Sequence, residues 1–377
     1  MAYKQEHKAY GGVEAQKVKR VFISDCEGPI SKNDNAFEIT STFVPDGDKL
    51  FTVISRYDDV LADVVKRPNY KAGDTLRLIL PFLKAYDVTD RKIWDFSAKN
   101  LILISNVKET LQYLRNIADS FIVSTSYEHY IKALCQALEF PYENTYCTRL
   151  SIDKYFITEK EKTKLKEIAK EIAQMPTIEI PQKTKSLKDF PKTDQETVRR
   201  LDEIFWKEIT GMKSGRMYSE VNPIGGDEKA EAVEDVVHRL GVALKNVMYV
   251  GDSITDVEAF KLVKENEGLA VSFNGNQYAV KNAEIAILSE NSLVTAVIAD
   301  IFCRFGKEQT LSLVENWDRE TLKKSKENPA IINHLFALYP KELHKVKIIT
   351  RENMEVLAQE SSEFRKKVRG EVIGRLG

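Results

Sequence analysis

The stretch VFISDCEGPI, residues 21–30, constrains the fold more than any other part of the chain. Its first four residues form a continuous, mostly apolar run, which is typical of a parallel strand covered on both faces. The run ends at Asp25, and Glu27 and Gly28 follow within three residues. Ligands of open α/β sheets bind beyond the carboxyl ends of the strands. Two carboxylates there can serve as nucleophile or metal ligand and as general acid or base. Taken alone, such an Asp is more commonly a turn former or a helix cap.

A second strand end carries two further acids in NVMYVGDSITDVEAF, residues 246–260. The predicted strand ends at Gly251, and Asp252 and Asp256 then share one face of the first turn of a predicted helix. Carboxylate oxygens are hard ligands, which Mg²⁺ prefers together with water and phosphate oxygens. The alternative role is structural, because Asp252 or Ser253 could equally cap this helix.

A lysine occupies an unusual place in IGGDEKAEAVEDVVHRLG, residues 224–241. Two glycines precede the predicted helix, and Lys229 falls in its first turn, where the helix dipole makes a cation unfavourable. An anionic ligand would explain this position, because free backbone N–H groups and a lysine together make a phosphate site. The alternative is a lysine on a solvated surface.

Hydroxyl groups follow a third predicted strand in FIVSTSYEHY, residues 121–130. We expect this strand to end at Ser124, with Thr125 and Ser126 directly after it. A hydroxyl and a free N–H group at a strand end can hold a phosphoryl oxygen. The alternative role for these hydroxyls is to cap the helix that follows.

The rest of the chain has the alternation of an α/β protein. Short apolar runs alternate with charged helical stretches, which indicates crossover units and a mostly parallel sheet. The predicted strands are residues 21–24, 121–124, 144–150, 247–251, 269–273 and 285–288. Three stretches with helical spacing do not fit this alternation: residues 31–110, 151–222 and 303–377. We expect two helical insertions into one α/β core and a helical tail.

Composition excludes several classes of protein. The 377 residues contain 56 Lys and Arg against 57 Asp and Glu, so the net charge of −1 gives no general attraction for nucleic acid. No apolar run approaches the roughly 20 residues of a spanning helix, and the polar N-terminus lacks the apolar core of a signal peptide. The four cysteines have no CxxC or metal-ligand spacing, which favours free thiols. We therefore expect a cytoplasmic protein that does not insert into a membrane.

Together these motifs resemble the haloacid dehalogenase (HAD) superfamily. The order is Asp25-x-Glu27-Gly, a serine at a strand end, Lys229 at a helix start, and Gly-Asp252-Ser-x-x-Asp256. Within the superfamily, the Asp-x-Glu-Gly motif is similar to that of the phosphoserine phosphatase-like group, which includes bacterial phosphoserine phosphatase/homoserine phosphotransferase. The chain also resembles an archaeal branch that is labelled as an energy-converting hydrogenase subunit, although no motif here explains a hydrogenase role.

The resemblance implies an α/β, HAD-like fold: a doubly wound, mostly parallel sheet with helical cap insertions and a helical C-terminal extension. The implied core consists of residues 18–30, 105–150 and 224–290, with a helical cap at 31–104, a second helical insertion at 151–223 and the extension at 303–377. One insertion is a candidate dimerisation arm, so a homodimer through the helical extensions is a further expectation.

The resemblance also implies a chemistry, the Mg²⁺-dependent hydrolysis of a small phosphorylated metabolite through an aspartyl-phosphate. Asp25 would be the nucleophile and Glu27 the general acid and base. The implied metal ligands are Asp25, Glu27 through its backbone carbonyl, Asp252 and Asp256. The implied phosphate-binding residues are Ser124, Thr125 and Lys229. A cation is also expected on physical grounds, because four acidic groups in one place repel one another strongly.

Two departures from the family pattern leave other functions open. Glu27 is one methylene longer than the usual Asp, and Pro29 replaces a more common Thr or Val. Proton transfer needs a heavy-atom reach of about 2.6 to 3.2 Å, so the longer side chain must meet the leaving group differently or act as a poorer acid. Phosphotransfer to a small alcohol is a sibling reaction. A non-catalytic protein that keeps the fold as an interaction or regulatory scaffold is the alternative from another class.

Overall fold

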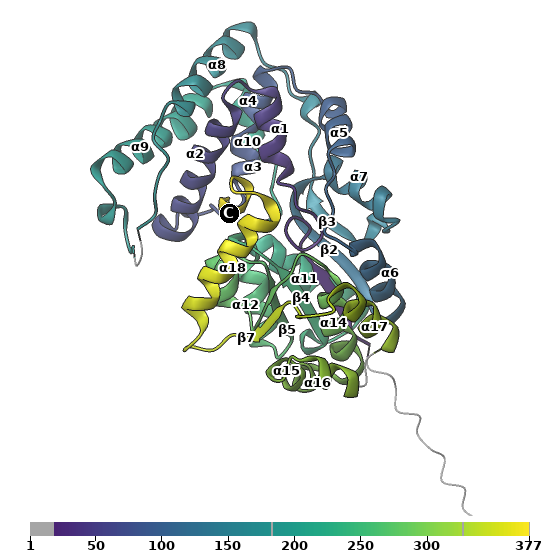
Figure 1. Ribbon diagram of the computed structural model, residues 1–377. Coiled ribbons are helices and arrows are strands. Elements are labelled where there is room, and N and C mark those ends of the chain that lie inside the picture. Colours follow the sequence, from purple (N-terminus) through teal and green to yellow (C-terminus); the bar gives the residue numbers. More distant parts are fainter. Residues whose placement is uncertain (1–18, 182–183, 326–327, 377) are drawn as a thin grey trace, which may run out of the picture.

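A seven-stranded sheet forms the centre of the computed structural model, which describes residues 19–181, 184–325 and 328–376. The strand order is β3 (Thr145–Thr148), β2 (Asp119–Tyr127), β1 (Val21–Ser24), β4 (Val247–Gly251), β5 (Leu269–Phe273), β6 (Ile285–Leu288) and β7 (Lys345–Ile348). The pairs are parallel except β6 with β7, so the predicted α/β class and mostly parallel sheet are confirmed (Figure 1). Residues 1–18, where we expect no signal peptide and where the predicted core begins, lie outside the described residues.

The strand predictions fail at the β2–β3 edge and in the tail. β1, β4, β5 and β6 have the predicted bounds, whereas β3 is shorter than predicted. β2 does not end at Ser124, because its pairing with β3 continues to Tyr127 across a register shift between these two residues. Thr125 and Ser126 therefore lie in an irregular part of a strand. The predicted helical extension at 303–377 also contains one strand that was not predicted, β7, which pairs with the edge of the sheet.

Helices cover both faces of the sheet, which explains why most strands are continuous apolar runs. On one face, Phe22 and Met248 pack in a cluster with three helices: α6 (Val107–Ile117), α7 (Glu128–Leu138) and α14 (Leu293–Phe305). On the other face, Ile23 and Tyr249 pack with three more: α11 (Asp227–Leu240), α12 (Val257–Glu265) and α13 (Gln277–Asn282). Successive strand residues point to opposite faces, so both sets must be apolar.

The two insertions form a single helical body above the sheet, which we call the cap (Figure 1). The first contributes α1 (Asn35–Phe43), α2 (Gly47–Asp59), the π-helical η1 (Val60–Val65), α3 (Thr75–Leu78), α4 (Leu80–Ala85) and α5 (Asp90–Lys99). The second contributes α8 (Glu159–Ala173), α9 (Lys192–Glu203), the π-helical η5 (Ile204–Ile209) and α10 (Arg216–Glu220). One apolar cluster runs through both, and Tyr57 stacks on Phe205 with ring centroids 5.6 Å apart. The second insertion therefore shares its core with the first.

The tail folds back onto the rest of the chain. It contains α15 (Lys307–Glu315), α16 (Arg319–Lys324), α17 (Pro329–Leu338) and, after β7, α18 (Met354–Arg369). Leu357 and Ala358 of α18 pack on residues of α13 and β6. Figure 1 shows α18 in yellow, rising from the sheet toward the cap, and Leu376 joins the apolar cluster of the cap. The tail thus connects core and cap.

Short 3₁₀ turns complete the description: η2 (Tyr142–Asn144), η3 (Ile152–Lys154), η4 (Leu187–Asp189), η6 (Lys213–Gly215), η7 (Leu244–Asn246), η8 (Ile254–Asp256) and η9 (Ile373–Arg375).

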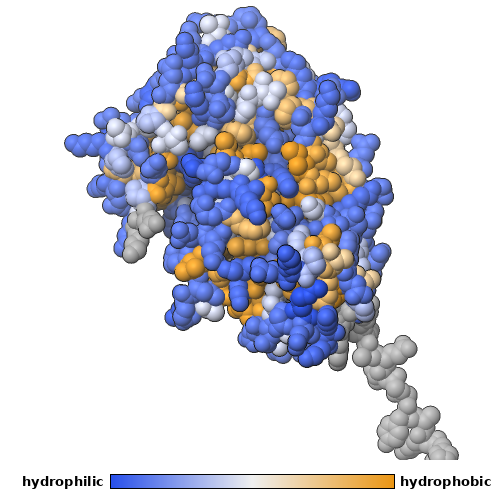
Figure 2. Space-filling view, viewed as in Figure 1, coloured by the Kyte–Doolittle hydropathy of each residue, from blue (hydrophilic) through white to orange (hydrophobic). Residues whose placement is uncertain are grey.

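One face of the molecule is drawn by hydropathy in Figure 2. Figure 2 shows a largely hydrophilic face, with apolar side chains gathered across its middle, where cap and core meet. Within the described part of the chain, no helix has both the length and the apolar character needed to cross a bilayer.

Candidate active site

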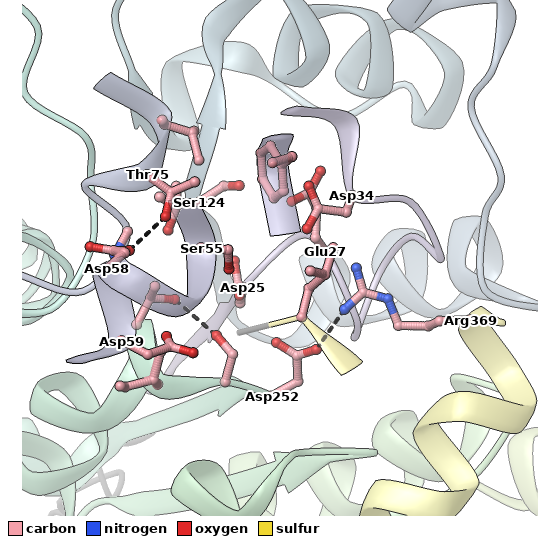
Figure 3. A pocket seen from close by; sticks show the side chains of 18 of the residues that line it. Asp25, Glu27, Asp34, Ser55, Asp58, Asp59, Thr75, Ser124, Asp252 and Arg369 are labelled. Atoms are coloured by element: carbon pink, nitrogen blue, oxygen red, sulfur yellow. Dashed lines mark hydrogen bonds and ion pairs between the residues drawn. The ribbon is translucent and has the colours of Figure 1, made fainter. Parts of the chain in front are cut away.

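A cavity lies where the cap faces the sheet edge (Figure 3). Its walls come from the loops after the strands, from the cap and from α18. The lining includes Asp25, Glu27, Asp34, Ser55, Asp58, Asp59, Ser124, Thr125, Asp252, Ser253, Arg365 and Arg369. Five of the predicted site residues are therefore brought together at one cavity: Asp25, Glu27, Ser124, Thr125 and Asp252. The other two, Lys229 and Asp256, are fully buried beside it.

Asp25, Asp252 and Asp256 form a compact group of acids. One carboxylate oxygen from each lies within 4.8 Å of the others. The backbone N–H of Asp25 donates to the carbonyl of Val250 at 2.7 Å, which ties the end of β1 to β4. β2 pairs with one side of β1 and β4 with the other, so the strand order reverses at β1, and α/β folds bind ligands at such a switch point. Burial raises the pKa of Asp25 to about 7, although Lys229 acts in the opposite direction.

Lys229 links two of these acids. Its Nζ lies 2.9 Å from Asp25 Oδ2 and 2.7 Å from Asp256 Oδ1, and the side chain has no exposed surface. The interpretation as a solvated surface lysine is therefore wrong. Burial alone would lower the pKa of Lys229, but the two carboxylates outweigh it and hold the pKa above its ordinary value. Lys229 is a permanent cation that faces Asp25.

Asp256 anchors the loop after β4. Its Oδ1 accepts hydrogen bonds from Lys229 and from the hydroxyl of Tyr249 at 2.8 Å. Its Oδ2 accepts the backbone N–H groups of Asp252 at 2.9 Å and Ser253 at 3.0 Å. Because both oxygens are engaged, Asp256 is better placed to orient Asp252 than to bind a cation itself.

Asp252 contacts two arginines of α18. Arg365 Nη1 forms an ion pair with Asp252 Oδ2, and Arg369 Nη1 lies 3.2 Å from the same oxygen. Burial raises the pKa of Asp252, whereas the two guanidinium groups act to lower it. The sequence predictions include neither arginine. A charged amphipathic helix carries no signal that two of its cations are buried against an acid more than 100 residues away.

Glu27 is held by the start of the cap. Its Oε1 accepts the backbone N–H of Asn35 at 2.7 Å. The neighbouring Asp34 caps α1 by accepting the N–H of Phe37 at 3.0 Å. Burial, and then the charge of Asp34, raise the pKa of Glu27 well above its ordinary range. A raised pKa favours the protonated form of a carboxyl group, which is the form that a general acid needs.

The hydroxyls of β2 face the cavity from the irregular end of that strand. Ser124 Oγ accepts the backbone N–H of Ser126 at 3.2 Å. Thr125 Oγ1 is buried and has no hydrogen-bond partner within the described residues, although Thr125 lines the cavity. A buried hydroxyl without a partner costs free energy, so a ligand atom is a fitting acceptor or donor for it.

The cap adds two acids that the sequence analysis does not single out. Asp58 and Asp59 lie at the end of α2 and are nearly inaccessible to solvent. Asp58 Oδ2 accepts the N–H of Gly73 at 2.9 Å and the hydroxyl of Thr75 at 2.8 Å. Burial raises the pKa of Asp58 to about 7 and that of Asp59 to about 6. The sequence pattern that could have indicated Asp58 and Asp59 is a pair of adjacent acids on the apolar side of an amphipathic helix.

Comparison with protein families places the chain in a known class. The model of haloacid dehalogenase-like hydrolases matches residues 88–300, which is more than half of the 377 residues. The chain therefore belongs to this family, and the predicted superfamily is confirmed. The matched range includes Lys229 and Asp252 but begins after Asp25 and Glu27. A search of curated proteins finds no match.

Solved structures extend the comparison of the fold to nearly the whole chain. A gene product from Archaeoglobus fulgidus is 24% identical, with a TM-score of 0.76 over 95% of this chain and 99% of that chain. The shared fold thus includes most of the cap and the tail. A weaker similarity is to phosphoserine phosphatase in its apo form, at 14% identity and a TM-score of 0.44, over 72% of this chain and 95% of that chain. A phospho-aspartyl intermediate analogue of phosphoserine phosphatase is similar at 15% identity and a TM-score of 0.45, over 73% of this chain and 96% of that chain.

Proposed function

We propose that the protein is a Mg²⁺-dependent phosphomonoester hydrolase that acts on a small phosphorylated metabolite through an aspartyl-phosphate on Asp25. The observation that carries this proposal is the position of Asp25. It is buried directly after β1, 2.9 Å from Lys229 Nζ and within 4.8 Å of an oxygen of Asp252. Phosphoryl transfer depends mainly on positioning and charge neutralisation, which this arrangement supplies.

The donor set fits Mg²⁺. Asp25 and Asp252 offer hard oxygen atoms close together, and the backbone carbonyl of Glu27 is the third expected ligand. Asp256 fits less well, because hydrogen bonds already engage both of its oxygens. When bound, the ion would offset negative charge on the acids and on the phosphoryl group.

In the proposed reaction, a carboxylate oxygen of Asp25 attacks phosphorus while the bond from phosphorus to the alcohol oxygen breaks. Glu27 donates its proton to the departing oxygen. Glu27 then takes a proton from the water molecule that attacks the aspartyl-phosphate, which releases phosphate and restores Asp25. The raised pKa of Glu27 suits the first of these steps. Ser124 and Thr125 would donate hydrogen bonds to the phosphoryl oxygens.

Replacing Asp25 with Asn tests the proposal. We expect Mg²⁺-dependent hydrolysis of p-nitrophenyl phosphate to fall by roughly 10³-fold or more, because an amide is a poor nucleophile. Asp235→Asn is a matched control, since this acid of α11 is half exposed and does not line the cavity. A wild-type rate in Asp25→Asn, or no turnover of a broad panel of phosphorylated metabolites by the wild type, would refute the assignment.

The cellular setting is also part of the proposal. All four cysteines are buried and reduced, which supports a reducing, cytoplasmic compartment. A small phosphorylated substrate fits a cavity that the cap covers. The homodimer remains a prediction.

A further inference from the structure

One side of α2 forms part of the cavity wall. The residues of this helix that line the cavity are Phe51, Ser55, Asp58 and Asp59. Ser55 and Asp59 follow Phe51 at successive intervals of about one helical turn, so the three share one face of the helix. Figure 3 shows Ser55 close to the middle of the group of side chains that line the cavity. Because the sheet edge supplies the proposed phosphoryl site, this face of α2 is available to the alcohol part of a substrate.

Ser55 and Asp59 have polar atoms that the rest of the described chain does not engage. Only 7% of Ser55 and 2% of Asp59 are exposed. Asp59 Oδ2 accepts a hydrogen bond from Arg56 Nη1 at 3.2 Å, but Oδ1 accepts none from the residues that the structure describes. The hydroxyl of Ser55 likewise has no hydrogen-bond partner among them. Buried polar atoms are rarely left unpaired, so these two point to a ligand that donates hydrogen bonds.

This wall of the cavity is negatively charged. Asp58 forms no ion pair within the described part of the chain, and Asp59 pairs with Arg56, which does not itself line the cavity. Burial raises the pKa of Asp59 to about 6, with Arg56 acting in the opposite direction, so this carboxyl group is mostly ionised at neutral pH. A carboxylate on the substrate would meet like charge here, whereas an ammonium group would compensate it.

The two arginines that line the cavity are already engaged by the protein. Arg365 donates from Nη1 to Asp252 and from Nη2 to the carbonyl of Leu376 at 3.3 Å. Arg369 donates from Nε and from both Nη atoms to oxygen atoms of the chain. A carboxylate binds a guanidinium group best through two parallel hydrogen bonds. Neither arginine has both terminal nitrogen atoms free for this, so the cavity offers a poor site for a second anionic group of the substrate.

The cavity is small. Its volume is about 90 Å³, against roughly 300–1,000 Å³ for pockets that hold drug-sized ligands. The buried side chains of Phe51 and Leu76 add apolar surface to the lining. A short carbon chain with one charged end fits this lining better than a sugar or a nucleoside does.

We propose that the substrate is the phosphomonoester of a short alcohol that carries an ammonium group, and that Ser55 and Asp59 of α2 bind this group. The inference rests on the proposed function, because it concerns the alcohol part of the same substrate. An ammonium group has three N–H donors and no acceptor, which matches Asp59 Oδ1 and Ser55 Oγ. The two residues thus determine specificity, and esters with a neutral or carboxylate-bearing alcohol bind more weakly.

Calorimetry on the full chain with Mg²⁺ tests the inference, because it measures the binding of phosphonates, whose carbon–phosphorus bond replaces the ester bond. The three probes are aminopropylphosphonate, propylphosphonate and carboxyethylphosphonate, which end in an ammonium group, a methyl group and a carboxylate. We expect the wild type to bind the ammonium compound at least about tenfold more tightly than the neutral one, because a hydrogen bond to a charged group contributes that much affinity. The carboxylate compound should bind most weakly.

Two variants assign the preference to α2. Asp59→Asn should remove most of the preference for the ammonium compound over the neutral one, and Ser55→Ala, a smaller change to the fold, should reduce it about threefold. Asp63→Asn is the matched control. It removes the same charge about one turn further along, at an exposed position that does not line this cavity, and should keep the preference.

Equal affinity of the wild type for the ammonium and neutral compounds would overturn the inference. A preference that is unchanged in both Asp59→Asn and Ser55→Ala, or that is lost equally in Asp63→Asn, would also overturn it. Failure of the proposed function looks different: the wild type would bind the ammonium compound preferentially yet hydrolyse no phosphomonoester.

Discussion

Asp58 is an acid of the cap whose charged form is disfavoured by burial. One of its oxygens accepts two hydrogen bonds, whereas Oδ1 is buried and has none within the described residues. Burial, followed by the charges of Asp74 and Asp59, raises the pKa of Asp58 to about 7. The folded protein therefore takes up a proton that the unfolded chain releases near pH 4. Folding loses stability as the pH rises between these two values.

Asp58→Asn should therefore stabilise the protein at pH 8 and have little effect at pH 4. The difference between the two pKa values corresponds to at most roughly 4 kcal/mol of unfolding free energy above pH 7. Urea unfolding of both proteins at the two pH values measures this. The control is Asp48→Asn, an exposed acid at the start of the same helix, which should not show the pH-dependent gain. An equal effect of Asp58→Asn at both pH values would contradict the prediction.

The turn that joins β1 to the cap requires a glycine for two reasons. Gly28 has a φ of +111°, which side chains other than glycine rarely adopt. A Cβ atom there would also lie 2.0 Å from Oδ2 of Asp252 and 2.3 Å from its Cγ. The element that carries Asp25 and Glu27 is thus packed directly on the acid that follows β4.

Gly28→Ala should displace Asp252 and weaken Mg²⁺ binding by roughly 10-fold or more, since misplaced ligands and their supports typically cost this much affinity. Turnover should fall with it. Gly241→Ala separates strain from contact, because Gly241 also has a positive φ of 64° but no atom within 4 Å of its would-be Cβ. That variant should lose about 1 kcal/mol of stability and retain Mg²⁺ binding. Equal Mg²⁺ binding by the two variants would show that the contact with Asp252 is unimportant.

At the scale of the whole molecule, the cap depends on both insertions. Leu165 of α8, in the second insertion, is fully buried in the same apolar cluster as Leu50 and Phe51 of the first. Truncating a buried leucine to alanine typically costs 2–5 kcal/mol, roughly speaking, because it removes contacts and leaves a cavity. We therefore expect Leu165→Ala to destabilise the first insertion as well as the second.

Hydrogen exchange of backbone amides measures this outcome. We expect the amides of α2 to exchange faster after the Leu165→Ala substitution. Glu167→Ala, on the exposed side of the same helix, should leave exchange unchanged. Faster exchange confined to α8 would indicate that the second insertion folds separately from the first.

Local patterns were sufficient for β1, β4, β5 and β6 and for the acids that follow β1 and β4. β4, β5 and β6 are buried on both faces, so their continuous apolar runs mark them at the predicted bounds. Strand ends of a parallel sheet meet at one edge, which is why Asp25 and Asp252 could be placed together from sequence. β7 was missed because its four residues, KVKI, lie at an edge and are too few to show a period.

Contacts between distant segments could not be predicted in the same way. Arg365 lies 113 residues from Asp252, and its helix has the pattern of many solvated helices. Asp58 has the same chemical type as acids on the surface, and only the packing of α2 turns it inward. Periodicity reports which residues share a face of an element, but it does not report which other element covers that face. The charge balance around Asp252 therefore follows from the docking of α18 between core and cap, whereas the sheet and its row of acids follow from the chain itself.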